Sequence, residues 1–401
     1  METLATTFGQ RATQTETLEV VPKHQRLFIG IPRETTLQEN RVALVPHSVA
    51  TLTAHGHRIV VESGAGQKSK YSDNDYSESG AEIAKSREEV FRADVMLKVA
   101  PLTLEEIDLM RPNQVIISPI HLPLLNPEYI IKLQKKRVIA LAMEYIRDDD
   151  TGVFPIVRIM SEIAGTSAIL IAADLLSTAR GGKGVLLGGI AGVPPAKVII
   201  LGAGVVAEFA SRTAIGLGAE VRIFDNNVYK LMRLQKHVGR QLHTSVINPQ
   251  HLREQLITAD VAIGAIHSPH GRTPVVVSED IVQRMKPGSV IVDVSIDQGG
   301  IFETSQTTSL DKPTFVKHGV IHYCVPNIPS RVARTASEAI SNILTSLLLK
   351  AESGGILPLI TSHEGLRNGV YTYKGCLTNA YLGERFQLKS TNLDLLITSD
   401  F

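Results

Sequence analysis

The sequence predicts an α/β protein with two domains, each built around a parallel β-sheet. Its 401 residues exceed what one ordinary hydrophobic core organises. Short apolar runs recur along the chain in two sets, and segments long enough for crossover helices separate the runs. With 5% aromatic residues and no Trp, Leu, Ile, Val and Ala must build the cores, which is typical of α/β proteins.

The apolar runs predict ten strands. The first sheet is expected to contain residues 27–31, 58–62, 94–99, 114–118 and 138–142. The second is expected to contain residues 197–201, 220–224, 261–265, 289–294 and 319–324. Because helix-length connections separate successive runs within each set, two separate α/β domains follow.

Two long helices are expected to join the domains. Apolar residues at helical spacing predict one over residues 161–178, and a second apolar stripe, over residues 331–350, is positioned to return the chain to the first domain. Residues 180–196 contain six Gly and indicate an exposed loop, which alone reads as a plain linker. The tail after residue 350 is expected to be irregular, and the polar residues 1–26 to form a mobile extension.

Composition excludes several classes of function. Lys and Arg total 41 against 40 Asp and Glu, and a net charge of +1 argues against a nucleic-acid partner. Cys324 and Cys376 are too few and too isolated for a disulfide framework or a zinc site. No run reaches the roughly 18 consecutive apolar residues of a membrane helix. A cytoplasmic enzyme with no membrane partner and no metal centre is therefore expected.

The sharpest motif is a glycine-rich turn between a strand and a helix. The strand expected at 197–201 runs directly into Gly202-x-Gly204-x-x-Ala207. Gly202 permits a tight turn, Gly204 lets the backbone approach a pyrophosphate, and the small Ala207 lets the next helix pack closely. The N-terminus of that helix offers free amide donors to a phosphate. The pattern predicts a dinucleotide site.

An acidic residue indicates which dinucleotide binds. The strand after the glycine turn ends at Asp225, the position of a carboxylate that hydrogen-bonds an adenosine ribose. A carboxylate there disfavours a 2′-phosphate, and Asn226 and Asn227 follow in place of arginine. NAD is therefore favoured over NADP, although Lys230 nearby leaves NADP open.

Polar residues follow four of the predicted strands, where ligands of parallel sheets bind. They are Lys98 and His121 in the first domain, and Asp297 and Asn327 in the second. Each alone also fits a strand end, a cap or a turn. Together they offer a cation for a substrate carboxylate, a histidine that moves protons and a carboxylate beside it. They predict a cleft between the domains.

A series of short motifs runs colinearly along nearly the whole chain. The series comprises Gly30-Ile-Pro-Arg-Glu-Thr, Arg41-Val-Ala-Leu-Val-Pro46, Glu62-Ser-Gly-Ala-Gly66, Leu97-Lys98-Val99, Ile120-His121-Leu122, Met160-Ser-Glu-Ile-Ala-Gly165, Gly181-Gly-Lys-Gly-Val-Leu-Leu-Gly-Gly189, the Gly202 turn, Ile296-Asp-Gln-Gly-Gly300 and Tyr323-Cys-Val-Pro-Asn327. The chain thereby resembles the alanine dehydrogenase and proton-translocating transhydrogenase family, most closely its alanine dehydrogenases. Val45, Thr166 and Ala207 depart from the usual family pattern, where Thr or Ser, Arg and Gly are common.

The resemblance implies roles for particular residues. Arg41 and Lys98 would bind the carboxylate and keto group of pyruvate or alanine, His121 and Asp297 would share the acid and base work, and Asn327 would line the same pocket. Contacts with NAD are implied for Ser161, Gly204, Asp225 and Lys230, with the loop around Ile266 on the adenosine side. The glycine-rich residues 180–196 fall on a segment characteristic of the family, which weakens the linker interpretation.

The resemblance also implies that the NAD domain is an insertion. This domain would span residues 155–331, the discontinuous substrate domain would combine residues 27–154 with 332–401, and the active site would lie in the cleft between them. A homo-oligomer, a hexamer, is implied as well.

The function expected from the resemblance is reversible oxidative deamination of L-alanine by NAD to pyruvate and ammonia, with a hydride leaving the substrate Cα. Three alternatives stay open. The chain could be the NAD(H)-binding component of a transhydrogenase, a dehydrogenase of a related amino acid, or a non-catalytic NAD-sensing or scaffold protein.

Overall fold

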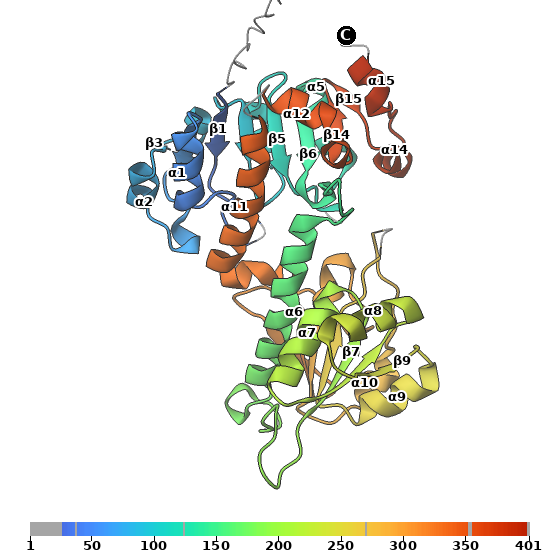
Figure 1. Cartoon of the computed structure of the whole chain (residues 1–401). Coiled ribbons are helices and arrows are strands. Elements are labelled where there is room, and N and C mark those ends of the chain that lie inside the picture. The colour runs from blue at the N-terminus through green and yellow to red at the C-terminus, as the bar shows by residue number, and fades with distance from the viewer. Residues whose placement is uncertain (1–25, 37, 123–124, 269–270, 352–354, 399–401) are drawn as a thin grey trace, which may run out of the picture.

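The molecule has two lobes, each a β-sheet flanked by helices (Figure 1). The computed structural model describes residues 26–36, 38–122, 125–268, 271–351 and 355–398. Both sheets are mostly parallel. The predicted fold class is therefore confirmed.

The upper lobe in Figure 1 contains an eight-stranded sheet in the order β15-β14-β6-β5-β4-β1-β2-β3. Its strands are β1 Phe28–Ile31, β2 Arg58–Glu62, β3 Glu82–Ala84, β4 Val95–Leu97, β5 Val115–Ser118, β6 Ile139–Ala142, β14 Val370–Tyr373 and β15 Cys376–Leu377. Its helices are α1 Pro46–Ala54, α2 Asp73–Glu78, α3 Arg87–Val90, α4 Leu104–Leu109, α5 Pro127–Lys135, α12 Ile356–Ser362, α13 Glu364–Arg367, α14 Ala380–Phe386 and α15 Leu393–Thr398, with the 3-10 turns η1 Gln67–Ser69 and η3 Met143–Tyr145. β14 runs antiparallel to β6, so distant parts of the chain share one sheet.

The lower lobe contains a seven-stranded sheet in the order β12-β13-β11-β10-β7-β8-β9. Its strands are β7 Lys197–Leu201, β8 Glu220–Phe224, β9 His243–Ser245, β10 Val261–Gly264, β11 Val290–Asp293, β12 Thr314–Lys317 and β13 Val320–Tyr323. Its helices are α7 Val205–Gly216, α8 Val228–Val238, α9 Pro249–Ile257 and α10 Glu279–Gln283, with the 3-10 turns η4 Thr178–Arg180, η5 Val294–Gln298 and η6 Ile328–Val332. Only β12 pairs antiparallel within it.

Burial on both faces explains why the central strands are almost wholly apolar. Along β5, Val115 and Ile117 enter one core of the upper lobe, while Ile116 enters the core on the opposite face. Burying one such aliphatic side chain stabilises the fold by about 1.5–3 kcal/mol. All ten predicted strands are present, and β2, β7 and β8 have the predicted bounds.

Two long helices connect the lobes, as predicted (Figure 1). α6 spans Pro155–Leu175 and starts earlier than predicted because Pro155 occupies its first position. α11 spans Ala333–Lys350 and follows the turn η6. α6 packs so closely on α7 that a Cβ added to Gly165 would lie 2.3 Å from the Val206 carbonyl oxygen. Glycine at this position is what allows the crossing.

By length and composition alone, α6 could also cross a membrane. However, Ala164, Ala168 and Ala172 of this helix are buried in the hydrophobic core of the lower lobe. Helices at the core of globular proteins pass the same two criteria.

One prediction from the sequence was wrong, and the sequence also left some strands unpredicted. The tail beyond residue 350 is not irregular, because it forms helices α12 to α15 and adds the fully buried strand β14 to the first sheet. The edge strands β3, β9 and β12 were not predicted, since each is short and partly exposed. The mobile extension predicted for residues 1–26 lies outside the described residues, apart from Arg26.

The glycine-rich residues 180–196 form an exposed loop at the end of the lower lobe that points away from the upper lobe (Figure 1). Lys183 nevertheless anchors it, with Nζ 2.6 Å from the Asp260 carboxylate. The loop is therefore fastened to the sheet and is not a free linker.

Candidate active site

Arg41 lies in the connection between β1 and α1, and Glu39 holds it in place. The guanidinium donates from Nε and Nη2 to the two Glu39 carboxylate oxygens at 2.7 and 2.6 Å. Its Nη1 lies 3.1 Å from the Met160 sulfur of α6. Burial opposes the charge, but the Glu39 carboxylate outweighs it and raises the pKa of Arg41. The guanidinium therefore stays charged and keeps only part of its N–H fork for another ligand.

Asn327 joins the two lobes through this same carboxylate. Its amide Nδ2 donates to Glu39 at 2.7 Å, and its backbone N–H donates to Asp297 at 3.2 Å. Asn327 has φ of +56°, in the left-handed region that Asn tolerates better than most residues. Arg41, Glu39, Asn327 and Asp297 thus form one hydrogen-bonded chain across the lobes.

Asp297 lies in η5, one turn beyond β11. Burial raises its pKa to about 6, and the nearby Asp293 adds to this shift. The Asn327 N–H and the charge of Arg41 act in the opposite direction without cancelling it. A carboxyl group with such a pKa ionises near neutrality and is suited to proton transfer.

Lys98 follows β4 and is almost completely buried, with 1% of its side chain exposed. Its ammonium donates to Glu34 at 2.8 Å and to Glu106 at 3.1 Å. Burial would lower the pKa of Lys98, but the two carboxylates overcome this and raise it. Because an ammonium has three N–H donors, one is left for a further acceptor.

His121 lies in the loop after β5, in a left-handed conformation with φ of +49°. Its backbone N–H lies 3.4 Å from the Glu144 carboxylate, which also accepts the Ile120 N–H at 2.8 Å. Burial lowers the pKa of the imidazole, so the ring is neutral at physiological pH. Within the described residues, no hydrogen bond connects His121 to the hydrogen-bonded set of Arg41, Glu39, Asn327 and Asp297.

The glycine turn between β7 and α7 has the geometry of a dinucleotide cradle. Gly202 has φ of +114°, and a Cβ there would lie 2.3 Å from the Ala265 carbonyl oxygen. Gly204 is the N-cap of α7 without any side-chain cap, and a Cβ on it would meet nothing within 4 Å. The space above the helix N-terminus is therefore open to a phosphate, while Ala207 is fully buried beneath it.

The residues that are expected to contact the adenosine are Asp225, Lys230 and Ile266, which follow or flank strands next to the Gly202 turn. Asp225 follows β8, and its carboxylate accepts the Ala203 N–H at 2.8 Å. Lys230 is exposed on α8, and its charge, together with burial, lowers the pKa of His267. Ile266 follows β10, with its N–H 3.1 Å from the Ser295 hydroxyl. A glycine turn, an acid after the next strand and an open helix N-terminus together form the arrangement that binds dinucleotides in such sheets.

Several functional contacts were not predicted from the sequence. Glu34 lies inside the motif that begins at Gly30, and Glu39 lies two residues before the motif that begins at Arg41. Only the fold reveals that they hold Lys98 and Arg41. Glu144 lies two residues after the predicted strand 138–142, and that position was a usable signal. Ser161, by contrast, was predicted as an NAD contact. It lies one residue after Met160, on the turn of α6 that contacts Arg41.

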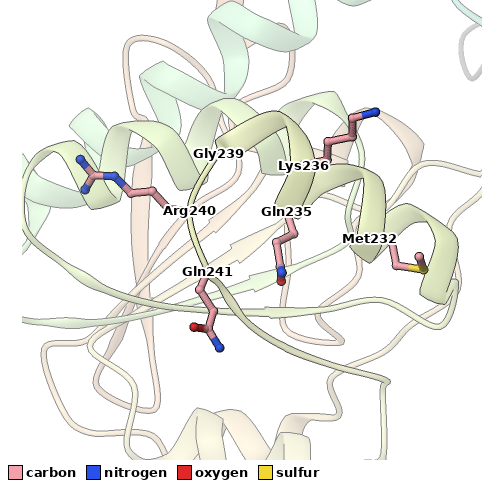
Figure 2. Close-up of a pocket in the computed structure, with 6 residues that line it drawn as sticks. All are labelled: Met232, Gln235, Lys236, Gly239, Arg240 and Gln241. Atoms are coloured by element: carbon pink, nitrogen blue, oxygen red, sulfur yellow. The ribbon is translucent and has the colours of Figure 1, made fainter.

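Two other features of the described residues do not compete with this site. Within residues covered by the structure, no cluster of three or more His, Cys, Asp or Glu is arranged to hold a metal ion. A hollow of about 440 Å³ lies at the end of α8, lined by Met232, Gln235, Lys236, Gly239, Arg240 and Gln241. Figure 2 shows that its two cations, Lys236 and Arg240, point in different directions and do not converge on a ligand.

Comparison with known proteins matches both halves of the chain. The models of the alanine dehydrogenase/PNT N-terminal and C-terminal domains match residues 30–164 and 168–380. The alanine dehydrogenase of Bacillus subtilis (strain 168) is 40% identical over 353 residues, which is 88% of this chain and 93% of that protein. Alanine dehydrogenase 2 of Staphylococcus aureus (strain USA300) is 38% identical over 368 residues, covering 91% and 98%.

Solved structures give the same result. An L-alanine dehydrogenase matches with a TM-score of 0.84 at 36% identity, covering 90% of this chain and 99% of that one. A transhydrogenase from Sinorhizobium meliloti matches with a TM-score of 0.74 at 26% identity, covering 88% and 98%.

Proposed function

Since this chain belongs to the alanine dehydrogenase/PNT family, we propose that it catalyses the reversible, NAD-dependent oxidative deamination of L-alanine to pyruvate and ammonia. The observation that carries this proposal is its 40% identity to a protein named alanine dehydrogenase, over 93% of that protein's length. The chain of Arg41, Glu39, Asn327 and Asp297 across the lobes supports it, because a small amino acid needs a cation and a proton acceptor together.

Arg41 and Lys98 bind the substrate in this proposal. The free edge of the Arg41 guanidinium holds the carboxylate, and the remaining N–H of Lys98 reaches the keto or amino end. Both cations are already fixed by carboxylates, so little side-chain entropy is lost when alanine binds. This positioning aligns the Cα hydrogen for transfer, which contributes rate by orientation.

His121 and Asp297 share the proton transfers. The bound NAD supplies the hydride acceptor. As water adds to the imine carbon, its proton passes to one of these two groups, and the departing nitrogen receives a proton before ammonia leaves. Closure of the lobes excludes water from the hydride step, and the bond from Asn327 to Glu39 supports such closure.

NAD binds along the β7–α7 turn in this proposal. The pyrophosphate lies against Gly202, Gly204 and the N-terminus of α7, with Ala207 packed below, while Asp225 hydrogen-bonds the adenosine ribose. Lys230 and Ile266 line the adenosine side, and Ser161 approaches from α6.

A spectrophotometric panel tests the function. We expect NADH formation with alanine as the preferred substrate and little with NADP. Preference for another amino acid would favour a related dehydrogenase. Failure to oxidise alanine, with NADH-to-NADP exchange on adding membrane components, would favour the transhydrogenase alternative, which has lower identity. Tight NAD binding without turnover of any amino acid would favour an NAD sensor.

Asp225→Ala is expected to raise the KM for NAD by about 10- to 100-fold, since a hydrogen bond to a charged group contributes about 1.5–3 kcal/mol. Turnover with NADP relative to NAD should rise, because the carboxylate no longer repels a 2′-phosphate. Steady-state kinetics with both dinucleotides measure this. Asp225→Asn is the matched control, since it keeps an acceptor for the Ala203 N–H. A wild-type KM in the Ala variant would contradict the ribose contact.

We also propose that the chain works as a cytoplasmic homohexamer in amino-acid catabolism, with no nucleic-acid or membrane partner. Exposed apolar side chains on α6 and the glycine-rich loop support self-association; they include Val157, Leu170, Leu186, Ile190 and Val193. Analytical ultracentrifugation should show a sixfold species, and a monomer at micromolar concentration would contradict it.

The domain division proposed is residues 27–154 with 332–401 for the substrate domain and 155–331 for the NAD domain. The pairing of β14 with β6 supports it, because the C-terminal segment thereby joins the first sheet.

A further inference from the structure

The Glu144 carboxylate accepts hydrogen bonds from the backbone at His121. It lies in η3 immediately after β6, and its Oε1 accepts the N–H groups of Ile120 at 2.8 Å and of His121 at 3.4 Å. These are the two amides that lead into the left-handed backbone of His121. L-residues rarely adopt that region unless their surroundings hold them there, and these two hydrogen bonds help to hold the backbone of His121.

The side chains of this pair contain two buried polar atoms whose bonding is incomplete. Nδ1 of His121 and Oε2 of Glu144 are both shielded from solvent, and neither has a hydrogen-bond partner within the described ranges. Buried polar atoms almost always have partners, because leaving one unsatisfied is costly. Oε1 of the same carboxylate lies 3.4 Å from the His121 backbone nitrogen, which places the Glu144 carboxylate next to His121.

Besides His121, three tyrosines interact with Glu144, and all three are uncharged at neutral pH. They are Tyr129 of α5, Tyr145 of η3 and Tyr371 of β14; burial raises the pKa of each phenol, and the charge of Glu144 adds to this. Burial likewise raises the pKa of Glu144 to about 7, while the N–H groups of Ile120 and His121 oppose the shift. Among the residues that the structure describes, no cation contributes to this shift. A carboxyl group that ionises near neutrality can accept a hydrogen bond from a neighbouring imidazole.

From this geometry we infer that Glu144 is the positioning residue of His121. Its Oε1 fixes the backbone, and its Oε2 accepts the Nδ1–H, directly or through one water, so that Nε2 presents its lone pair to the substrate. The inference rests on the proposed function, in which His121 moves protons. When water adds to the imine carbon and its proton passes to Nε2, the Glu144 carboxylate offsets the charge of the resulting imidazolium.

The tautomer of His121 tests this without any measurement of activity. In the full chain labelled with ¹⁵N-histidine, long-range proton–nitrogen NMR at pH 8.5 should show His121 protonated at Nδ1, with its signals assigned by their loss in His121→Gln. An Nε2–H tautomer would overturn the inference even if the enzyme oxidises alanine. A correct tautomer with no oxidation of alanine would instead count against the proposed function.

Glu144→Gln provides the second test. The amide oxygen still accepts the two backbone N–H groups, but the amide nitrogen cannot accept Nδ1–H. We expect the ring to switch to the Nε2–H tautomer and kcat for alanine to fall on the order of 10²-fold, with the KM for NAD unchanged.

Glu128→Gln, on the exposed start of α5, makes the same chemical change and should leave both measurements unchanged. Wild-type kcat and tautomer in Glu144→Gln would overturn the inference. Should this variant fail to fold by circular dichroism, the tautomer of the wild-type protein still decides.

Discussion

Asp297→Asn is expected to reduce kcat for alanine oxidation on the order of 10³-fold at pH 8, because it removes a group that takes up protons. The asparagine keeps an oxygen in place for the Asn327 N–H, which donates to Asp297 at 3.2 Å. The link between the lobes therefore survives, and the loss reports the missing proton acceptor. Steady-state kinetics give kcat, and NAD titration should show unchanged affinity.

The pH dependence of the wild-type enzyme follows from the same residue. Burial raises the pKa of Asp297 to about 6, so the carboxylate form is lost as the pH falls through that value. With saturating alanine and NAD, kcat should fall between pH 7 and pH 5, and the residual activity of Asp297→Asn should lack this step. Asp280→Asn, on exposed α10, should behave as wild type. Retention of more than a tenth of wild-type kcat by Asp297→Asn would exclude Asp297 from proton transfer.

Local patterns in the sequence predicted the parts of the fold whose causes are local. The turn at Gly202 needs glycine because a Cβ would strike the Ala265 carbonyl oxygen, and the strand before it is apolar because both faces are buried. β14 shows what such patterns miss. Its Val-Tyr-Thr-Tyr sequence alternates in polarity, and it is fully buried only because it pairs with β6, more than two hundred residues earlier.

The residues of the candidate site also fall into two groups, those that local sequence patterns predicted and those that only the fold reveals. Positions after strands identified Lys98, His121, Asp297 and Asn327, because parallel sheets gather their ligands at one edge. The carboxylates that hold them could not be assigned from spacing. Glu106 lies in the first turn of α4, where its bond to the Thr103 N–H explains it as a helix cap, yet the other oxygen of its carboxylate also accepts from Lys98. A local capping signal therefore concealed a role in the site.

Lys98→Met is expected to abolish activity and to destabilise the protein. The loss of the donor that polarises the substrate should lower kcat/KM on the order of 10²- to 10³-fold. Removing one partner from a buried ion pair costs about 3–5 kcal/mol in the free energy of unfolding. Glu106 keeps Arg87 at 2.8 Å, so Glu34 is the carboxylate left without its cation. Urea denaturation measures the stability, with Lys132→Met, which breaks a partly exposed pair with Asp108, as the control.

The stability loss in this variant should depend on pH in a defined direction. Without Lys98, burial keeps the pKa of Glu34 above its unfolded value of about 4.3, since the hydrogen bond from the Val99 N–H opposes this shift less than a buried cation does. A carboxyl group whose pKa is raised on folding destabilises the native state when it ionises. The deficit relative to wild type should therefore be small near pH 4.3, grow as the pH rises and level off above the folded pKa. A deficit independent of pH would assign the loss to packing.

The double variant Lys98→Met/Glu34→Gln separates the two roles of Lys98. Glutamine removes the stranded charge and still offers an oxygen to the Val99 N–H, which donates to Glu34 at 2.7 Å. Most of the lost stability should return, because a neutral buried amide with a hydrogen bond costs far less than an unpaired carboxylate. Activity should stay lost, because no donor replaces the third N–H of Lys98. Recovery of activity together with stability would mean that Lys98 only balances buried charge and that another group binds the substrate.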